Sequence, residues 1–199
     1  MNVLGRSIYA LLFGSIFIIS CSDTLQVPKP RTYPKIEFPN KSYLIFDAPF
    51  CDFKFEYPAY SKVIRDTLFF GEAPLDDCWF DIYFEKFNGN IHCTYYPFSS
   101  ETELLKLVSD EFKMADKHQV RADYIDEMKI SKPNGTTGMI FEIEGATASN
   151  LQFYLTDTQK HFLRGALYFQ TQARPDSIAP VYDFIKEDII KLIDSFEWK

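Results

Sequence analysis

The sequence predicts an α+β domain in which an antiparallel sheet of about six strands packs against two main helices. First, aromatic residues make up 17% of the 199 residues, with 20 Phe and 12 Tyr. Such large side chains favour strands and bury much area each. Second, strand-like segments follow one another through short connections, which is typical of an antiparallel sheet. Third, two segments, starting near residues 100 and 177, carry apolar residues at helical spacing.

The chain begins with a segment that has the features of an export signal. Arg6 precedes an uncharged apolar run over residues 8–19, which is shorter than the roughly 20 residues that span a bilayer. A small residue, Ser20, stands directly before Cys21. We therefore predict a lipoprotein signal peptide over residues 1–20 and lipid attachment at Cys21. The alternative is an ordinary secretory signal followed by a chance cysteine.

Residues 21–42 are predicted to be a tether between the lipid and the folded domain. Prolines recur every two to five residues from Pro28 to Pro39, and proline favours extended backbone over helix. The remaining residues, 43–199, are long enough for one well-buried domain and short for two. No other segment is long and apolar enough to cross a membrane.

Alternating apolar and polar residues predict the first strands. In residues 53–57 the aromatic side chains alternate with charged ones, which is the period of a half-buried strand. Residues 78–84 repeat this pattern, and Asn88-Gly89 supplies a turn before the run 91–96, so we predict a hairpin. Residues 61–77 contain glycine and proline and are predicted to be irregular.

A capping box at Ser100 and Glu103 predicts the first helix, which ends near His118. Its apolar positions are Leu105, Val108, Phe112 and Ala115. Four strands then follow, over residues 124–130, 137–144, 148–156 and 161–171. Their short connections favour an antiparallel meander.

The last helix is the clearest element of the sequence, and Asp176 or Ser177 is predicted to cap it. One stripe is apolar: Val181, Phe184, Ile185, Ile189, Leu192, Ile193 and Phe196. Polar residues are predicted to face away from this stripe: Asp183, Lys186, Glu187, Lys191 and Asp194. We expect the stripe to pack on the sheet, with a partner-binding helix as the alternative.

Three cysteines remain after Cys21, and export makes a disulfide permissible. Cys51 and Cys78 each start a strand-like run and are the favoured pair, with three free buried thiols as the alternative. Cys93, inside a strand, is predicted to be a small buried side chain. We expect no metal site, because the cysteine spacings show no paired-ligand signature and the chain has 3 His.

The charge balance and the lack of catalytic motifs limit the function. The net charge of −7 argues against a nucleic-acid partner, which needs a clustered basic face. The sequence contains no nucleophile elbow, P-loop or dinucleotide fingerprint, so we expect no enzyme and no cofactor. His161 opens a strand and is expected at a surface or edge position. Glu142 and Glu144 are expected on a solvated sheet face.

Several segments, in order along nearly the whole chain after residue 21, resemble the gliding motility lipoprotein GldD family of Bacteroidetes. They are PKPR at 28–31, Cys51 with FEYP at 55–58, CW at 78–79, FNGNIH at 87–92, QFYLTD at 152–157, HFLRGALYF at 161–169 and DFIKED at 183–188. Cys93 departs from the family pattern, where an aliphatic or small residue is expected. The order of elements is also similar to that of PsbP/Mog1-like sandwich folds.

The resemblance implies a non-enzymatic accessory lipoprotein needed for gliding motility and type IX protein secretion. Its implied partners are other envelope lipoproteins and the gliding and secretion machinery. We expect one face of the sheet to bind a partner, and polar residues among aromatic ones suggest which face. The candidate residues are Asn150, Gln152, His161 and Arg164. The alternative for these residues is that they only build central strands.

A second function remains open, namely an envelope lipoprotein that binds or hydrolyses glycan or peptidoglycan. A deep pocket with convergent polar groups would favour it, and a sheet with helices on both sides would count against it. Ser22-Asp23 lacks a longer acidic run after Cys21. Such an acidic run would resemble a surface-export signal. Because the chain lacks it, we expect a lipid anchor in the outer membrane, with the domain facing the periplasm.

Overall fold

The computed structural model describes residues 35–67, 73–171 and 174–199. The predicted signal peptide, Cys21 and the tether as far as residue 34 lie outside the described residues. Residues Ile36–Lys199 form one compact unit. None of the helices in the described part is long and apolar enough to cross a membrane.

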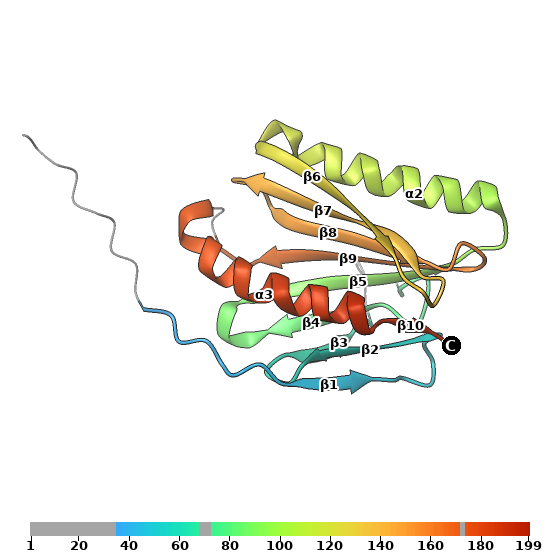
Figure 1. Ribbon diagram of the computed structural model, residues 1–199, viewed down its shortest axis with the longest axis horizontal. Coiled ribbons are helices and arrows are strands. Elements are labelled where there is room, and N and C mark those ends of the chain that lie inside the picture. Colours follow the sequence, from blue (N-terminus) through green and yellow to red (C-terminus); the bar gives the residue numbers. More distant parts are fainter. Residues whose placement is uncertain (1–34, 68–72, 172–173) are drawn as a thin grey trace, which may run out of the picture. The chain divides into compact units, whose positions relative to one another are not determined.

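The described strands form two antiparallel sheets (Figure 1). One has three strands in the order β1-β2-β10, and the other has seven in the order β3-β4-β5-β9-β8-β7-β6. The strands are β1 (Tyr43–Phe46), β2 (Phe53–Pro58), β3 (Lys62–Arg65), β4 (Phe80–Phe84), β5 (Gly89–Pro97), β6 (Ala122–Ser131), β7 (Thr137–Gly145), β8 (Ser149–Thr156), β9 (His161–Phe169) and β10 (Glu197–Trp198). The helices are η2 (Glu85–Phe87), α2 (Glu101–Asp116), η3 (Lys117–Val120) and α3 (Pro175–Ser195).

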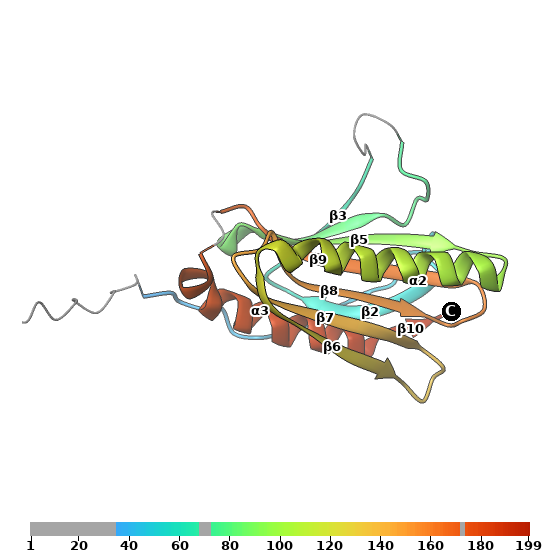
Figure 2. The ribbon, with the colours of Figure 1, turned by 90° about the horizontal axis from the view of Figure 1, so that it is seen from above.

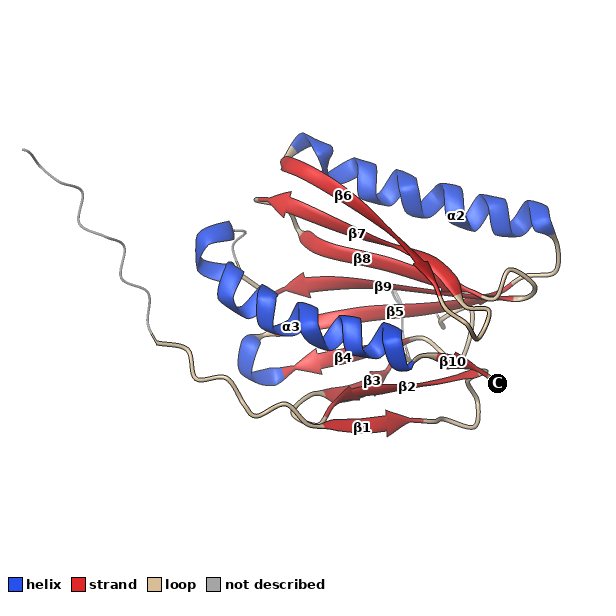
Figure 3. Ribbon diagram, viewed as in Figure 1, coloured by secondary structure: helices blue, strands red, loops and turns tan. Residues whose placement is uncertain are grey.

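The two long helices cover opposite faces of the seven-stranded sheet (Figures 2 and 3). Successive strand residues point to opposite faces, and β7 illustrates the division. Ile140 joins the core that contains Ile185 and Ile189 of α3. Phe141, the next residue, joins the core beneath α2 and meets Phe112 edge to face, with ring centroids 5.0 Å apart. The predicted α+β sandwich of a sheet with two helices is confirmed.

Several predicted elements are also present, in part with shifted ends. Strands β4 and β5 pair as an antiparallel hairpin, and the strands from β6 to β9 each pair with the next as an antiparallel meander. At the start of α2, the Ser100 hydroxyl accepts a hydrogen bond from the Glu103 backbone N–H. The Glu103 carboxylate accepts one from the Ser99 N–H at 2.8 Å.

Other expectations were wrong. Residues 62–65, predicted to be irregular, form β3, an edge strand too short to give a periodic pattern. The chain pairs as a strand from Phe80, not from residue 78. Helix α3 begins at Pro175 with Arg174 as its N-cap, and no side chain caps it. Leu105 is 61% exposed, because α2 turns neighbouring positions to the sheet. These inward positions are Leu104, Leu107, Val108, Phe112 and Ala115.

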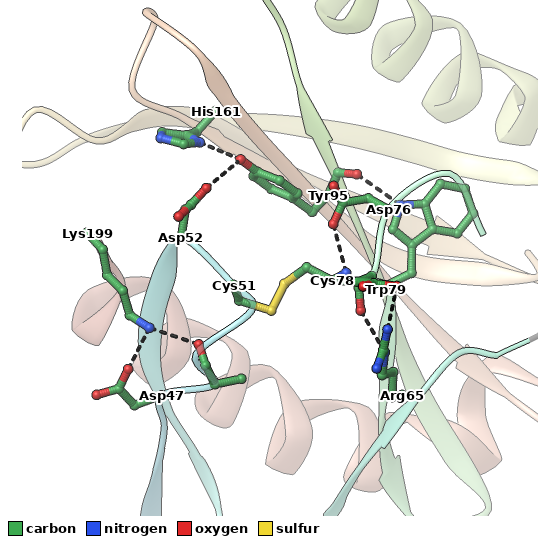
Figure 4. Close-up of a disulfide and its surroundings, with 12 residues drawn as sticks. Asp47, Cys51, Asp52, Arg65, Asp76, Cys78, Trp79, Tyr95, His161 and Lys199 are labelled. Carbon is green, nitrogen blue, oxygen red and sulfur yellow. Dashed lines mark hydrogen bonds and ion pairs between the residues drawn. A yellow bond between two sulfur atoms is a disulfide. The ribbon is translucent and has the colours of Figure 1, made fainter. Parts of the chain in front are cut away.

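A disulfide between Cys51 and Cys78 links the segments that precede β2 and β4 (Figure 4). It therefore joins the three-stranded sheet to the seven-stranded one. Both cysteines are buried, and the Asp76 carboxylate accepts a hydrogen bond from the Cys78 N–H at 2.8 Å. Next to it, the Trp79 indole donates to the Tyr95 carbonyl at 2.9 Å. Cys93 is free and buried.

Candidate functional site

Strand register assembles a row of polar residues on the α2 face of the sheet. Asp81 of β4 pairs with His92 of β5, and His92 pairs with Ala166 of β9. Ala166 in turn pairs with Gln152 of β8. Paired residues in neighbouring strands project to the same face. The row therefore crosses four strands and has a small residue, Ala166, at its middle.

A cavity of about 290 Å³ lies between this row and the second half of α2. We call it the α2 groove. Its lining residues are His92, Glu111, Met114, Lys117, His118, Gln152, Arg164, Gly165, Ala166 and Tyr168. Ala166 has a small side chain, so the sheet floor of the α2 groove stays low between the polar groups. Two of the four residues predicted for a binding surface, Gln152 and Arg164, line it.

Arg164 is held in the α2 groove by three neighbours, two on β5 and one on α2. Its Nε donates to the Thr94 hydroxyl at 2.7 Å, and its Nη1 donates to the Glu111 carboxylate at 3.2 Å. Its Nη2 donates to the Tyr96 hydroxyl at 3.1 Å. Charged hydrogen bonds in a half-buried site fix a guanidinium more firmly than exposed ion pairs do. Arg164 therefore ties α2 to β5 and β9.

Glu111 has the most unusual ionisation in the α2 groove. Its side chain is almost fully buried on the inward face of α2. Burial raises the pKa of Glu111 from 4.5 to about 7, although the nearby Arg164 charge acts to lower it. The desolvation of the carboxylate thus outweighs its ion pair. A carboxyl group that titrates near neutral pH makes the α2 groove sensitive to proton concentration.

We expect the stability of the protein to depend on pH through Glu111. Its pKa is higher in the folded protein than in the unfolded chain, so its stabilising contribution is complete below about pH 4.5 and is lost as the pH rises through 7. The free energy of unfolding of Glu111→Gln should therefore rise relative to that of wild type by about 2 to 3 kcal/mol between pH 5 and pH 8.

Urea unfolding of both proteins at a series of pH values measures this difference, in which the contributions of all other groups cancel. Parallel stability curves for the two proteins would contradict the assignment.

His118 and Gln152 close the end of the α2 groove near η3. The His118 Nε2 lies 2.9 Å from the Gln152 amide nitrogen. Burial lowers the pKa of His118, which favours the neutral ring, and a neutral ring nitrogen accepts the amide N–H. Gln152 is buried, so its amide is committed to an internal hydrogen bond.

The structure does not bring the four predicted binding residues to one surface. Asn150 is the second residue of β8, where its amide donates to the carbonyls of Ile143 at 2.9 Å and Gly145 at 3.3 Å. His161 is buried on the opposite face from the α2 groove, where its Nδ1 lies 2.5 Å from the Tyr95 hydroxyl (Figure 4). The expected surface or edge position for His161 is wrong, because β9 lies between β5 and β8.

The prediction that Glu142 lies on a solvated sheet face is also wrong. It faces α3, where it accepts hydrogen bonds from the Tyr182 hydroxyl at 2.8 Å and from Lys186 Nζ at 2.6 Å. Lys186, predicted to face away from the sheet, therefore contacts it. Glu144 is exposed, as expected.

Three polar side chains converge beside the α2 groove, and the sequence alone did not connect them. Asp66, Asp81 and His92 each place one donor atom within 4.8 Å of the other two. They come from three neighbouring strand segments, so only the strand register could have revealed the cluster. Glu111 did leave a signal, since it stands among apolar residues on the inward stripe of α2.

Comparisons with known proteins give a family and a fold. The model of a family described as "gliding motility lipoprotein GldD" matches residues 23–198. Comparison with curated proteins finds no significant match. Among solved structures, the chain is similar to the solution structure of cyanobacterial PsbP (CyanoP) from Synechocystis sp. PCC 6803. The TM-score is 0.50 at 14% identity, over 83% of this chain and 98% of that one. This likeness concerns the fold alone.

Proposed function

The chain belongs to the gliding motility lipoprotein GldD family, and from this premise we propose a non-enzymatic accessory protein required for gliding motility and type IX protein secretion. The observation that carries the proposal is the extent of the family match, which spans residues 23–198. It begins two residues after Cys21, which supports a mature protein that starts at this cysteine. In the proposal Cys21 carries the lipid and residues 22–42 form the tether.

A scaffold role is supported by how the polar groups of the α2 groove are used. Arg164 and Glu111 bond each other, and Gln152 bonds His118. These contacts connect α2 and η3 to the sheet, so they build a rigid face. The aromatic side chain of Tyr168, which is 38% exposed, lines that face. Exposed aromatic and apolar groups beside fixed polar ones are typical of a protein-binding surface.

We therefore place the partner-binding surface on the α2 side of the domain, with the rim of the α2 groove as its centre. The partner in the proposal is another protein of the gliding and secretion machinery. A membrane location follows from the lipid, and the proposal places it in the outer membrane, facing the periplasm. Protease treatment of intact cells checks the location: a periplasmic domain stays intact, and digestion would refute this placement.

The second candidate function is binding of glycan or peptidoglycan. The α2 groove favours it, because a cavity of about 290 Å³ with several polar side chains and Tyr168 at its rim suits a sugar. Against it, helices cover both faces of the sheet, and four of the polar groups in the α2 groove are paired with one another, Arg164 with Glu111 and Gln152 with His118.

Crosslinking and purification of the tagged full-length protein from native membranes tests the two functions. We expect enrichment of gliding or secretion proteins, and loss of this enrichment in the Cys21→Ala variant. At the rim, Tyr168→Ala should lower the yield of the crosslinked partner at least about threefold, since it removes an exposed aromatic contact.

Tyr124→Ala is the matched control, because Tyr124 is 60% exposed on β6, away from the α2 groove. Equal losses in both tyrosine variants would place the partner elsewhere on the domain. Recovery of glycan fragments without a protein partner would favour the second function.

A further inference from the structure

Asp66, Asp81 and His92 form a compact cluster of oxygen and nitrogen donors. Asp81 and His92 are register partners on β4 and β5. Asp66 directly follows β3 and donates its backbone N–H to the Trp79 carbonyl at 2.9 Å, which continues the pairing of β3 with β4. Because side chains alternate along strands, Asp66 lies on the same face as Ile64, the register partner of Asp81.

The distances in the cluster suit a small cation. The His92 Nδ1 is 2.8 Å from the Asp81 Oδ1 and 3.5 Å from the Asp66 Oδ2. Ligand atoms 2.0–2.2 Å from a tetrahedral zinc ion lie about 3.4 Å apart. One pair already has this spacing. The shorter pair shares a proton in a hydrogen bond, and a metal ion that takes the place of this proton would move the two atoms apart by about 0.6 Å.

The electrostatics of the cluster also favour a cation. Two carboxylates face one imidazole, and all three side chains are half-buried, with exposed fractions of 18–29%. Burial, and then the negative charge of Asp81, raise the pKa of Asp66. The two carboxylates therefore repel each other in a site with little water, and a divalent ion would offset both charges.

We propose that Asp66, Asp81 and His92 form a binding site for one Zn²⁺ ion. One imidazole and two carboxylates are a donor set that zinc accepts, and three protein ligands leave a fourth position open. Asp81 and His92 stand on paired strands, which hold their positions better than loops do. Asp66 directly follows β3 and is fixed by its backbone hydrogen bond to Trp79. His92 also lines the α2 groove, so the ion lies at the edge of the proposed partner-binding surface. This inference is independent of the proposed partner.

Isothermal titration of the full-length protein with zinc chloride tests the site. The protein is purified in detergent without a histidine tag. We expect one ion per molecule and a dissociation constant in the micromolar range or below. His92→Gln should weaken binding at least about 30-fold and Asp66→Asn at least about tenfold, because each removes a direct ligand.

His118→Gln is the matched control, since His118 is a half-buried histidine on the same sheet face outside the cluster. It should bind zinc like wild type. X-ray absorption at the zinc edge should show only nitrogen and oxygen ligands. Sulfur ligation would instead assign the zinc to a cysteine and overturn the proposal.

The proposal is also overturned if wild type shows no binding at 100-fold excess of zinc, or if Asp66→Asn binds zinc as tightly as wild type. Near-UV circular dichroism confirms that each variant is folded, and Asp66→Asn keeps the test decisive if His92→Gln fails to fold.

Discussion

Replacing both Cys51 and Cys78 with alanine is expected to lower the free energy of unfolding by about 3 to 4 kcal/mol. The bond closes a loop across a sequence separation of 27 residues, and a cross-link over a loop of this length restricts the unfolded chain by about this amount. The disulfide also holds β2 against β4, where the rings of Phe55 and Phe80 stack with centroids 5.8 Å apart. The loss should therefore appear as a lower midpoint of urea unfolding.

Reducing agent supplies the internal control for this prediction. Dithiothreitol should lower the unfolding midpoint of wild type toward that of Cys51→Ala/Cys78→Ala and leave the double variant unchanged. Cys93→Ala should keep the sensitivity to reduction, since Cys93 is free. If dithiothreitol shifted the double variant as much as wild type, the disulfide would not be the source of the stability.

The second large effect is expected from Asp188→Ala, which should lower the free energy of unfolding by about 3 to 5 kcal/mol. Asp188 is 1% exposed within the inward stripe of α3. Its carboxylate accepts hydrogen bonds from Lys41 at 3.0 Å, from the Tyr43 hydroxyl at 2.9 Å and from the Tyr60 hydroxyl. Removing it leaves the two tyrosine hydroxyls without this acceptor and takes the buried carboxylate from Lys41, which keeps the exposed Glu187 and the Phe184 carbonyl.

Thermal and urea unfolding measure this effect. Asp188→Asn keeps an acceptor oxygen without the charge and should lose less than half as much stability. Asp183→Ala, an exposed aspartate on the same helix, is the matched control and should stay within about 0.5 kcal/mol of wild type. A loss of similar size in Asp183→Ala would point to helix propensity and not to the buried carboxylate.

The strands that the sequence predicted well are those with a strong periodic pattern of apolar residues. β4, β5 and β7 to β9 bury one or both faces, so apolar residues mark them clearly. β3 has four residues and β10 has two, and segments this short cannot display a period. β10 pairs with β2, a long-range contact that no local pattern encodes.

The candidate site was harder to predict than the fold because it depends on buried charges. Glu111 and Asp188 both occupy inward helix positions, whereas sequence patterns normally assign carboxylates to the solvent side. Glu111 is buried beside Arg164, and Asp188 is buried beside Lys41 and the hydroxyls of Tyr43 and Tyr60. Asp66, Asp81 and His92 meet only through strand register, which residue spacing along the chain does not reveal.

The contacts of Phe38 and Lys41 with α3 also bear on where a mechanical load would enter the domain. With Cys21 held in a membrane, as proposed, a pull on the N-terminal segment first meets Phe38, whose ring stacks on Phe184 with centroids 4.5 Å apart. It then meets Lys41, whose Nζ also donates to the Phe184 carbonyl at 2.7 Å. The force then passes sideways into α3, and β1, the edge strand next in the chain, is shielded from being peeled off β2. If the proposed partner moves, these contacts keep the load on α3 and off the edge of the three-stranded sheet.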